Sequence, residues 1–143
     1  MARASNDVPA ALAGYDDGRN RLSTIMLMHD RLATSMMLFM AAIGIWGMFM
    51  YFTGGGLTGS FNGALAIGEV LIIAQVAFGV ILYFKGFRPE SSIHILYGLT
   101  AVIALPFIWS YMRERDARQA LLIFSLGALF VSGLAIRGMT TGS

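Results

Sequence analysis

Two histidines are the residues of this chain whose type and placement best suit cofactor chemistry. His29 lies at the start of the first apolar stretch and His94 at the start of the third. Successive membrane-spanning helices alternate in direction, so the first and third run the same way and both imidazoles lie at one membrane depth. Two imidazoles that face each other suit a low-spin haem iron with no open coordination position. The pair therefore predicts a b-type haem, with His29 and His94 as axial ligands.

Neighbouring residues could complete such a site. Ala33 and Gly98 each follow a histidine by four residues, so they lie one turn deeper on the same helix face and would leave room for a flat macrocycle. Arg31 and Arg88 are placed near the same level and could pair with the haem propionates. The simpler alternative is structural, because a histidine at the membrane interface needs no ligand and small residues let helices approach closely.

Other kinds of chemistry have no support in the sequence. The absence of cysteine excludes thiolate-bound iron–sulfur clusters, covalently attached haem and Cys-type zinc sites. Beyond a haem iron, two histidines near Asp30 and Glu90 are a poor ligand set for a transition metal. No nucleophile paired with a base, phosphate-binding loop or pair of catalytic carboxylates is evident. We expect no catalytic residue, no independent enzymatic activity and no nucleic-acid partner.

Glu69 is the one ionisable residue deep within an apolar stretch. A charge at such depth costs about 2.5 kcal/mol or more, so we expect a neutral carboxyl group that faces the bundle interior. Its candidate partners are the Val102 carbonyl, released by a proline four residues on, the Ser125 hydroxyl and the Trp46 indole. A hydrogen bond between helices is the simpler role, and contact with a proton or a quinone head group is the functional one. Gln75 is expected to bond to a neighbouring helix.

Four apolar stretches must position these residues. The chain has 143 residues, of which 57% are apolar and 13% are charged, whereas soluble domains contain about 25% charged residues. The surplus apolar surface must face lipid or another protein. Since about 20 residues of helix cross a bilayer, we predict spans over 28–52, 63–84, 92–112 and 117–136. The predicted fold is all-α: an integral membrane four-helix bundle, up-down-up-down, with short loops and a lipid bilayer around it.

Breaks in the apolar pattern predict the remaining boundaries. Residues 1–24 are expected to be a flexible polar tail, residues 25–137 the four-helix domain and residues 138–143 a short C-terminal tail. Asp116, followed three residues later by Gln119, resembles a capping box that opens the fourth span.

Basic residues near the span ends predict the orientation. On the side of the amino terminus lie Arg19, Arg21, Arg31, Lys85, Arg88 and Arg137, and on the other side Arg113, Arg115 and Arg118. The side with more basic residues is normally cytoplasmic. We therefore predict a multi-pass protein of the bacterial inner membrane with both termini in the cytoplasm.

The placement of the histidines also resembles a known family. A histidine followed closely by arginine at the head of one helix (His29-Asp30-Arg31-Leu32) and a second histidine at the head of the helix two further on (Ile93-His94-Ile95-Leu96) are similar to one four-helix half of haem A synthase. The similarity spans roughly residues 25–137, and membrane b-type cytochromes share the general arrangement. The resemblance implies a four-helix bundle with His29 and His94 as axial ligands. Haem A synthesis itself is not implied, since the family's second bundle has no counterpart here.

Electron transfer is the function that these features favour. The chain would be a small b-type haem subunit of a respiratory or photosynthetic complex and pass electrons between a quinone and a partner. The alternative is a cofactor-free accessory subunit that packs against larger membrane proteins or against copies of itself. Absorption spectroscopy distinguishes the two, because only the haem protein absorbs strongly in the Soret region.

Overall fold

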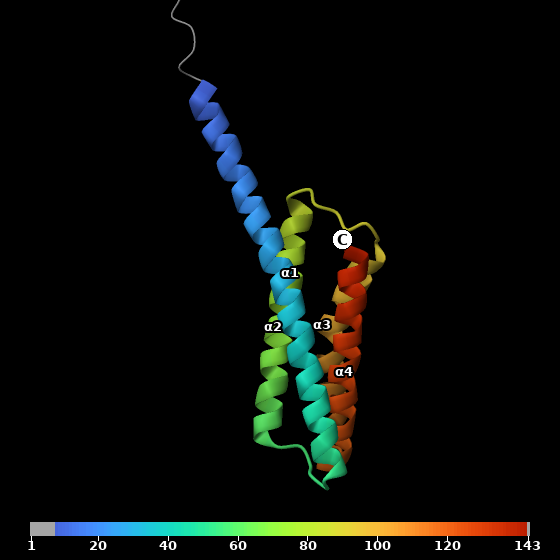
Figure 1. Cartoon of the computed structure of the whole chain (residues 1–143). Coiled ribbons are helices and arrows are strands. Elements are labelled where there is room, and N and C mark those ends of the chain that lie inside the picture. The colour runs from blue at the N-terminus through green and yellow to red at the C-terminus, as the bar shows by residue number, and fades with distance from the viewer. Residues whose placement is uncertain (1–7, 143) are drawn as a thin grey trace, which may run out of the picture.

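Four helices make up nearly all of the described chain. The computed structural model describes residues 8–142, with side chains from residue 17 onwards. The helices are α1 (Val8–Phe52), α2 (Gly59–Phe84), α3 (Ile93–Met112) and α4 (Ala117–Gly142). They run alternately up and down (Figure 1), and all four are long and apolar enough to cross a membrane. The described residues contain no strand, so the predicted all-α four-helix membrane bundle is confirmed.

Local sequence signals set the helix ends. The Thr58 hydroxyl accepts a hydrogen bond from the backbone N–H of Phe61 and so caps the start of α2. At the start of α4, the Asp116 carboxylate accepts from the backbone N–H groups two and three residues on, which confirms the predicted cap. Gly86, just beyond the end of α2, has a φ of 93°, a conformation that glycine adopts at little cost.

The structure differs from the prediction at both tails. Residues 8–24 continue α1 and residues 138–142 continue α4, whereas residues 1–7 and 143 lie outside the described residues. Each segment extends a helix that has already formed, so it does not bear the cost of helix nucleation. Within the α1 extension, Asp17 and Arg21 form an ion pair of 3.1 Å one turn apart. Polar composition alone therefore did not end either helix.

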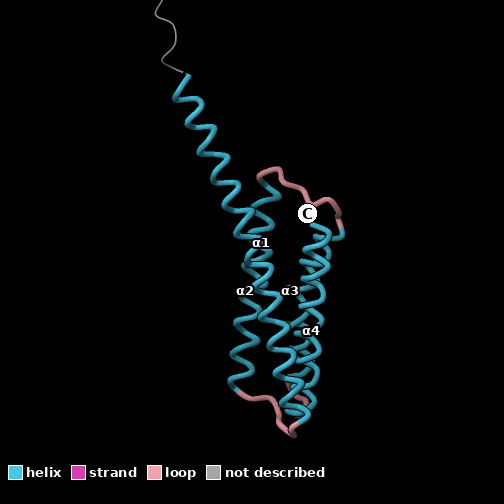
Figure 2. Tube along the Cα trace, viewed as in Figure 1, coloured by secondary structure: helices cyan, strands magenta, loops and turns pink. Residues whose placement is uncertain are grey.

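Helices that are consecutive in the chain are neighbours in the bundle. α1 packs against α2 and α4, and α3 packs against α4 and more lightly against α2. α1 and α3 therefore stand diagonally across the bundle, joined to their neighbours by short loops (Figure 2). All four helices contribute buried side chains to one core, among them Met40, Phe61, Leu105 and Leu121.

Small residues bring α1 and α4 together. A Cβ atom at Gly47 would collide with the buried Ser125 hydroxyl, and one at Gly44 would lie 2.6 Å from Leu129 Cγ. The Ser132 hydroxyl of α4 donates to a backbone carbonyl of α1 at 3.2 Å. In lipid the hydrophobic effect does not drive helices together, so close packing and such hydrogen bonds must do so.

The α1–α2 hairpin extends beyond the α3–α4 hairpin at the end of the bundle where α2 leads into α3. α2 has 26 residues and α3 has 20, which at 1.5 Å per residue are lengths of about 39 Å and about 30 Å. The upper end of α2 accordingly rises above the start of α3 and the end of α4 (Figure 1). The loop over residues 85–92 descends from the end of α2 to the start of α3.

Arginines lie over aromatic rings at both ends of the bundle. At the end of α2, Arg88 stacks over Tyr83 at 4.5 Å from the ring centroid. The pairs at the opposite end are Arg113 over Trp109 at 4.9 Å, Arg115 over Tyr111 at 5.4 Å and Arg118 over Tyr51 at 4.9 Å. Such amphipathic pairs are typical of the two interfaces of a membrane protein.

Gly47→Ala should destabilise the bundle by about 1–3 kcal/mol, because the added methyl group collides with Ser125 and with the Phe61 ring. Thermal unfolding in detergent, followed by circular dichroism, measures the change. Gly133→Ala is the matched control, since a Cβ atom there meets nothing within 4 Å and alanine favours a helix. The control should be at least as stable as the wild type, and equal loss in both variants would contradict this account of the α1–α4 contact.

Cysteine labelling tests the topology, because the chain has no cysteine of its own. Cysteines introduced at Gly55, in the α1–α2 turn, and at Glu90, in the α2–α3 loop, should react from opposite sides of the membrane. The distribution of basic residues predicts that Glu90 faces the cytoplasm. An impermeant reagent should therefore label position 55 on intact spheroplasts and position 90 only after permeabilisation. Labelling of both from one side would contradict the four-span topology.

Candidate cofactor site

His29 of α1 and His94 of α3 meet across the diagonal of the bundle, near the start of α3. Their ring centroids are 6.2 Å apart and the ring planes are inclined by 58°. A metal ion held by bonds of about 2 Å to one nitrogen of each ring needs ring centres roughly 6 Å apart. The predicted approach of the two rings is confirmed, and their spacing suits a two-histidine metal centre.

A group on a neighbouring helix holds each ring. His94 Nδ1 lies 2.9 Å from the backbone carbonyl of Gly138 on α4. A carbonyl can only accept, so Nδ1 carries the proton and Nε2 keeps its lone pair, as in most metal-binding histidines. His29 Nε2 lies 3.3 Å from the side-chain nitrogen of Gln75 on α2, which is the interhelical bond predicted for that glutamine. We call His29, Gln75, His94 and the Gly138 carbonyl the histidine cluster.

Two buried polar atoms of the histidine cluster have no hydrogen-bond partner among the described residues. They are His29 Nδ1 and Gln75 Oε1. Buried polar atoms are nearly always paired, and leaving one unpaired costs about 1–3 kcal/mol. Both atoms belong to the same cluster, so the cluster has the capacity to bind one further group.

Glycines on the two flanking helices let the histidine rings lie directly against the helix backbones. A Cβ atom at Gly79 of α2 would lie 3.3 Å from His29 Cε1, and one at Gly142 of α4 would lie 2.7 Å from His94 Cε1. A side chain at either position would therefore displace the neighbouring histidine ring. Gly98 differs from its predicted role, because a Cβ there would touch Val76 Cγ2 at 3.7 Å. α2 therefore fills the space expected beside Gly98.

The structure does not bring the two predicted propionate partners to the histidines. Arg31 follows His29 by two residues, which turns it almost to the opposite face of α1. There it lines an outer groove of about 450 Å³ together with Asp30, Thr34 and Ser35. Arg88 donates to the Tyr83 hydroxyl and stacks over that ring. Arg31 therefore lies near the level of His29 but on a different side of α1.

Glu69 is separate from the histidine cluster and lies deeper along α2. It is half-buried, and its Oε2 has no hydrogen-bond partner among the described residues. The predicted bonds to Val102, Ser125 and Trp46 do not form. Ser125 donates instead to a carbonyl of its own helix at 2.6 Å, and the Trp46 ring packs against Phe61 with centroids 5.5 Å apart.

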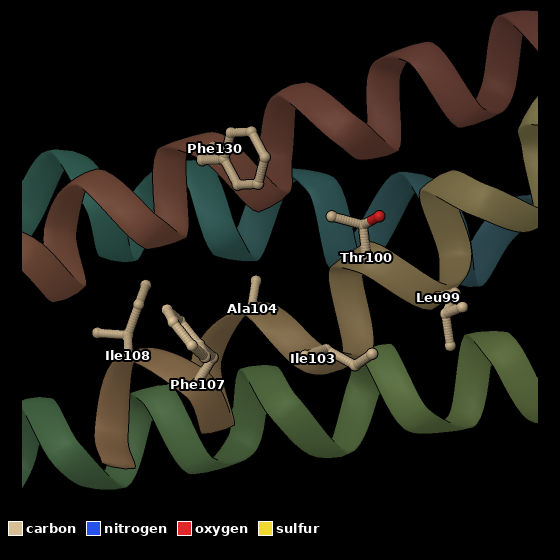
Figure 3. Close-up of a pocket in the computed structure, with 7 residues that line it drawn as sticks. All are labelled: Leu99, Thr100, Ile103, Ala104, Phe107, Ile108 and Phe130. Carbon is tan, nitrogen blue, oxygen red and sulfur yellow. The ribbon is translucent and has the colours of Figure 1, made fainter. Parts of the chain in front are cut away.

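A second groove runs between the outer sides of α3 and α4 (Figure 3). It has a volume of about 380 Å³ and is lined by Leu99, Thr100, Ile103, Ala104, Phe107, Ile108 and Phe130. Thr100 is its one polar residue, and the Thr100 hydroxyl donates to the Leu96 carbonyl of the same helix. The groove is suited to lipid chains or an apolar partner, and it offers no ligand for a metal.

No protein-family model, curated protein or solved structure gives a significant match to the chain. Among the side chains that the structure describes, in residues 17–142, no group of three or more histidine, cysteine, aspartate or glutamate residues could hold a metal ion. The histidine pair is therefore the strongest candidate site. A metal ion bound there would need ligands other than histidine, cysteine, aspartate or glutamate side chains at its remaining coordination positions.

We expect Glu69 to be a neutral acid, because a carboxylate at the bilayer centre costs about 2.5–3.5 kcal/mol. Glu69→Gln should leave thermal stability unchanged and remove the infrared band of one protonated carboxyl group. Glu114→Gln, an exposed position in the α3–α4 turn, is the control and should alter only carboxylate bands. Identical carbonyl regions in the wild type and Glu69→Gln would refute the neutral acid.

Proposed function

We propose that this multi-pass membrane protein is a small b-type cytochrome subunit that holds one haem b between His29 and His94 and transfers electrons. The observation that carries the proposal is the 6.2 Å separation of two imidazoles that belong to diagonal helices. Four membrane-spanning helices supply the apolar surroundings.

The roles of the residues follow from their contacts. His94 would bind iron through Nε2, because its Nδ1–H is engaged by the Gly138 carbonyl. His29 would supply the second imidazole through Nδ1, which has no hydrogen-bond partner among the described residues, while its Nε2–H would donate to the Gln75 amide oxygen. Gly79 and Gly142 let the two rings lie close to α2 and α4. A haem with two imidazole ligands supplies reversible one-electron transfer and has no open position for oxygen. The surrounding apolar side chains would exclude water, which influences the reduction potential.

Quinone and a partner protein are the proposed donor and acceptor. A quinone travels within the bilayer and can approach the exposed apolar sides of α3 and α4. The excess of basic residues at the histidine end supports a cytoplasmic position for the site in a bacterial inner membrane. A cofactor-free accessory subunit is the alternative, and the apolar groove between α3 and α4 favours it as a surface for a larger partner.

An absorption spectrum tests the proposal. Protein produced with an ample haem supply and purified in mild detergent should show a Soret band and the visible bands of a low-spin haem b. His29→Ala and His94→Ala should each abolish the low-spin spectrum, because each removes an axial ligand. Met36→Leu should leave it intact, since that buried α1 side chain lies two turns deeper.

Circular dichroism of the same samples shows whether each variant keeps its helices. Low-spin spectra in both folded histidine variants would defeat the ligand assignment. A colourless wild-type protein would defeat the haem proposal and favour the accessory subunit.

A further inference from the structure

Gln75 is the side chain of the histidine cluster to which the proposed function gives no role. Its position is unusual for an amide, because it lies on the stripe of α2 that faces the core, three residues after the buried Ile72 and four before Gly79. A polar group at such a place in a membrane helix is unfavourable unless it is bonded. Its partner is His29 Nε2, 3.3 Å away on α1.

We propose that Gln75 is a positioning residue, whose carboxamide holds the His29 ring in one tautomer and one orientation toward His94. The bond crosses from α2 to α1, and Gly79, one turn further on, lets the same ring lie against α2. The part of this inference that concerns iron rests on the proposed function. The part that concerns the His29 ring does not.

The two histidines are held in different ways. A backbone carbonyl holds His94, and it can only accept a proton from Nδ1. A side chain holds His29, and an amide can donate through its nitrogen or accept through its oxygen. The two arrangements put the ring proton on different nitrogens, but each leaves one tautomer of His29. Removing the amide therefore removes the constraint in either arrangement.

A polar group bonded to a metal-binding imidazole tunes the ligand. This requires the amide oxygen of Gln75 to accept from His29 Nε2–H, because Nδ1 then keeps its lone pair for the metal. Partners that accept the ring proton fix the orientation of the ring and raise its basicity, and their loss typically lowers metal affinity 10–100-fold. A more basic imidazole stabilises oxidised iron. Loss of the Gln75 amide should therefore weaken haem binding and raise the reduction potential, while an acidic side chain at the same position should lower the potential.

The first experiment needs no haem. Protein labelled with 15N-histidine is studied by NMR in detergent, at a pH where both rings are neutral, and His94→Ala assigns the two sets of ring signals. The wild type should show one tautomer at His29. Gln75→Leu, which is similar in size, should change the tautomer ratio at His29 and leave His94 unchanged. Gln75→Glu should restore a single tautomer, because a carboxyl group can also bond to the ring.

The matched control is Gln119→Leu, the same substitution at an exposed position at the opposite end of the bundle. Its His29 signals should equal those of the wild type. Identical His29 signals in Gln75→Leu and the wild type would overturn the inference. If Gln75→Leu does not fold, the unbranched Gln75→Met takes its place in the same comparison.

The second experiment uses haem-loaded protein. Gln75→Leu should bind haem about 10-fold or more weakly and show a higher midpoint potential, whereas Gln75→Glu should show a lower one and Gln119→Leu no change. Unchanged affinity and potential in Gln75→Leu would overturn the role toward iron. Absence of haem binding in the wild type would instead defeat the proposed function, and the NMR result would still decide whether Gln75 positions His29.

Discussion

The close contact between α1 and α4 is the interaction on which the rest of the bundle depends. Gly44 and Gly47 let the backbone of α4 approach, and the Ser132 hydroxyl bonds to a carbonyl of α1. In lipid, contacts of this kind replace the hydrophobic effect as the source of helix association. α4 also packs against α3 and carries Gly138, whose carbonyl meets His94 of α3, so α4 links the contact with α1 to the histidine end of the bundle. Packing in the middle of the bundle therefore determines the geometry at its end.

The histidine cluster follows from a second constraint, which is that polar groups within lipid must pair with one another. Each helix supplies one member: His29 from α1, Gln75 from α2, His94 from α3 and the Gly138 carbonyl from α4. The same hydrogen bonds join neighbouring helices and orient the two imidazoles. The packing of the helices and the proposed chemistry thus depend on the same atoms. His29 Nδ1 and Gln75 Oε1 have no hydrogen-bond partner among the described residues.

Depth in the membrane could be predicted from the sequence, and direction around each helix could not. The four spans and the shared depth of the two histidines follow from apolar length and alternating helix direction. The roles of Gly79 and Gly142 depend on how α2 and α4 are rotated, and helices that are apolar on nearly every side do not specify their rotation. Arg31 is an exception, because its two-residue offset from His29 already indicates the opposite face. The helical state of residues 8–24 depends on the helix that they extend, which composition does not reveal.

The unequal height of the two hairpins has a consequence for the lipid around them. α3, with 20 residues, matches a hydrocarbon layer of about 30 Å, whereas α2, with 26, exceeds it. A bilayer that matches α3 must become thicker beside α2, or α2 must tilt. A layer that matches α3 brings its head groups to the start of α3, where His94 occupies the first turn. The histidine cluster then lies close to the head groups, at one edge of the hydrocarbon layer.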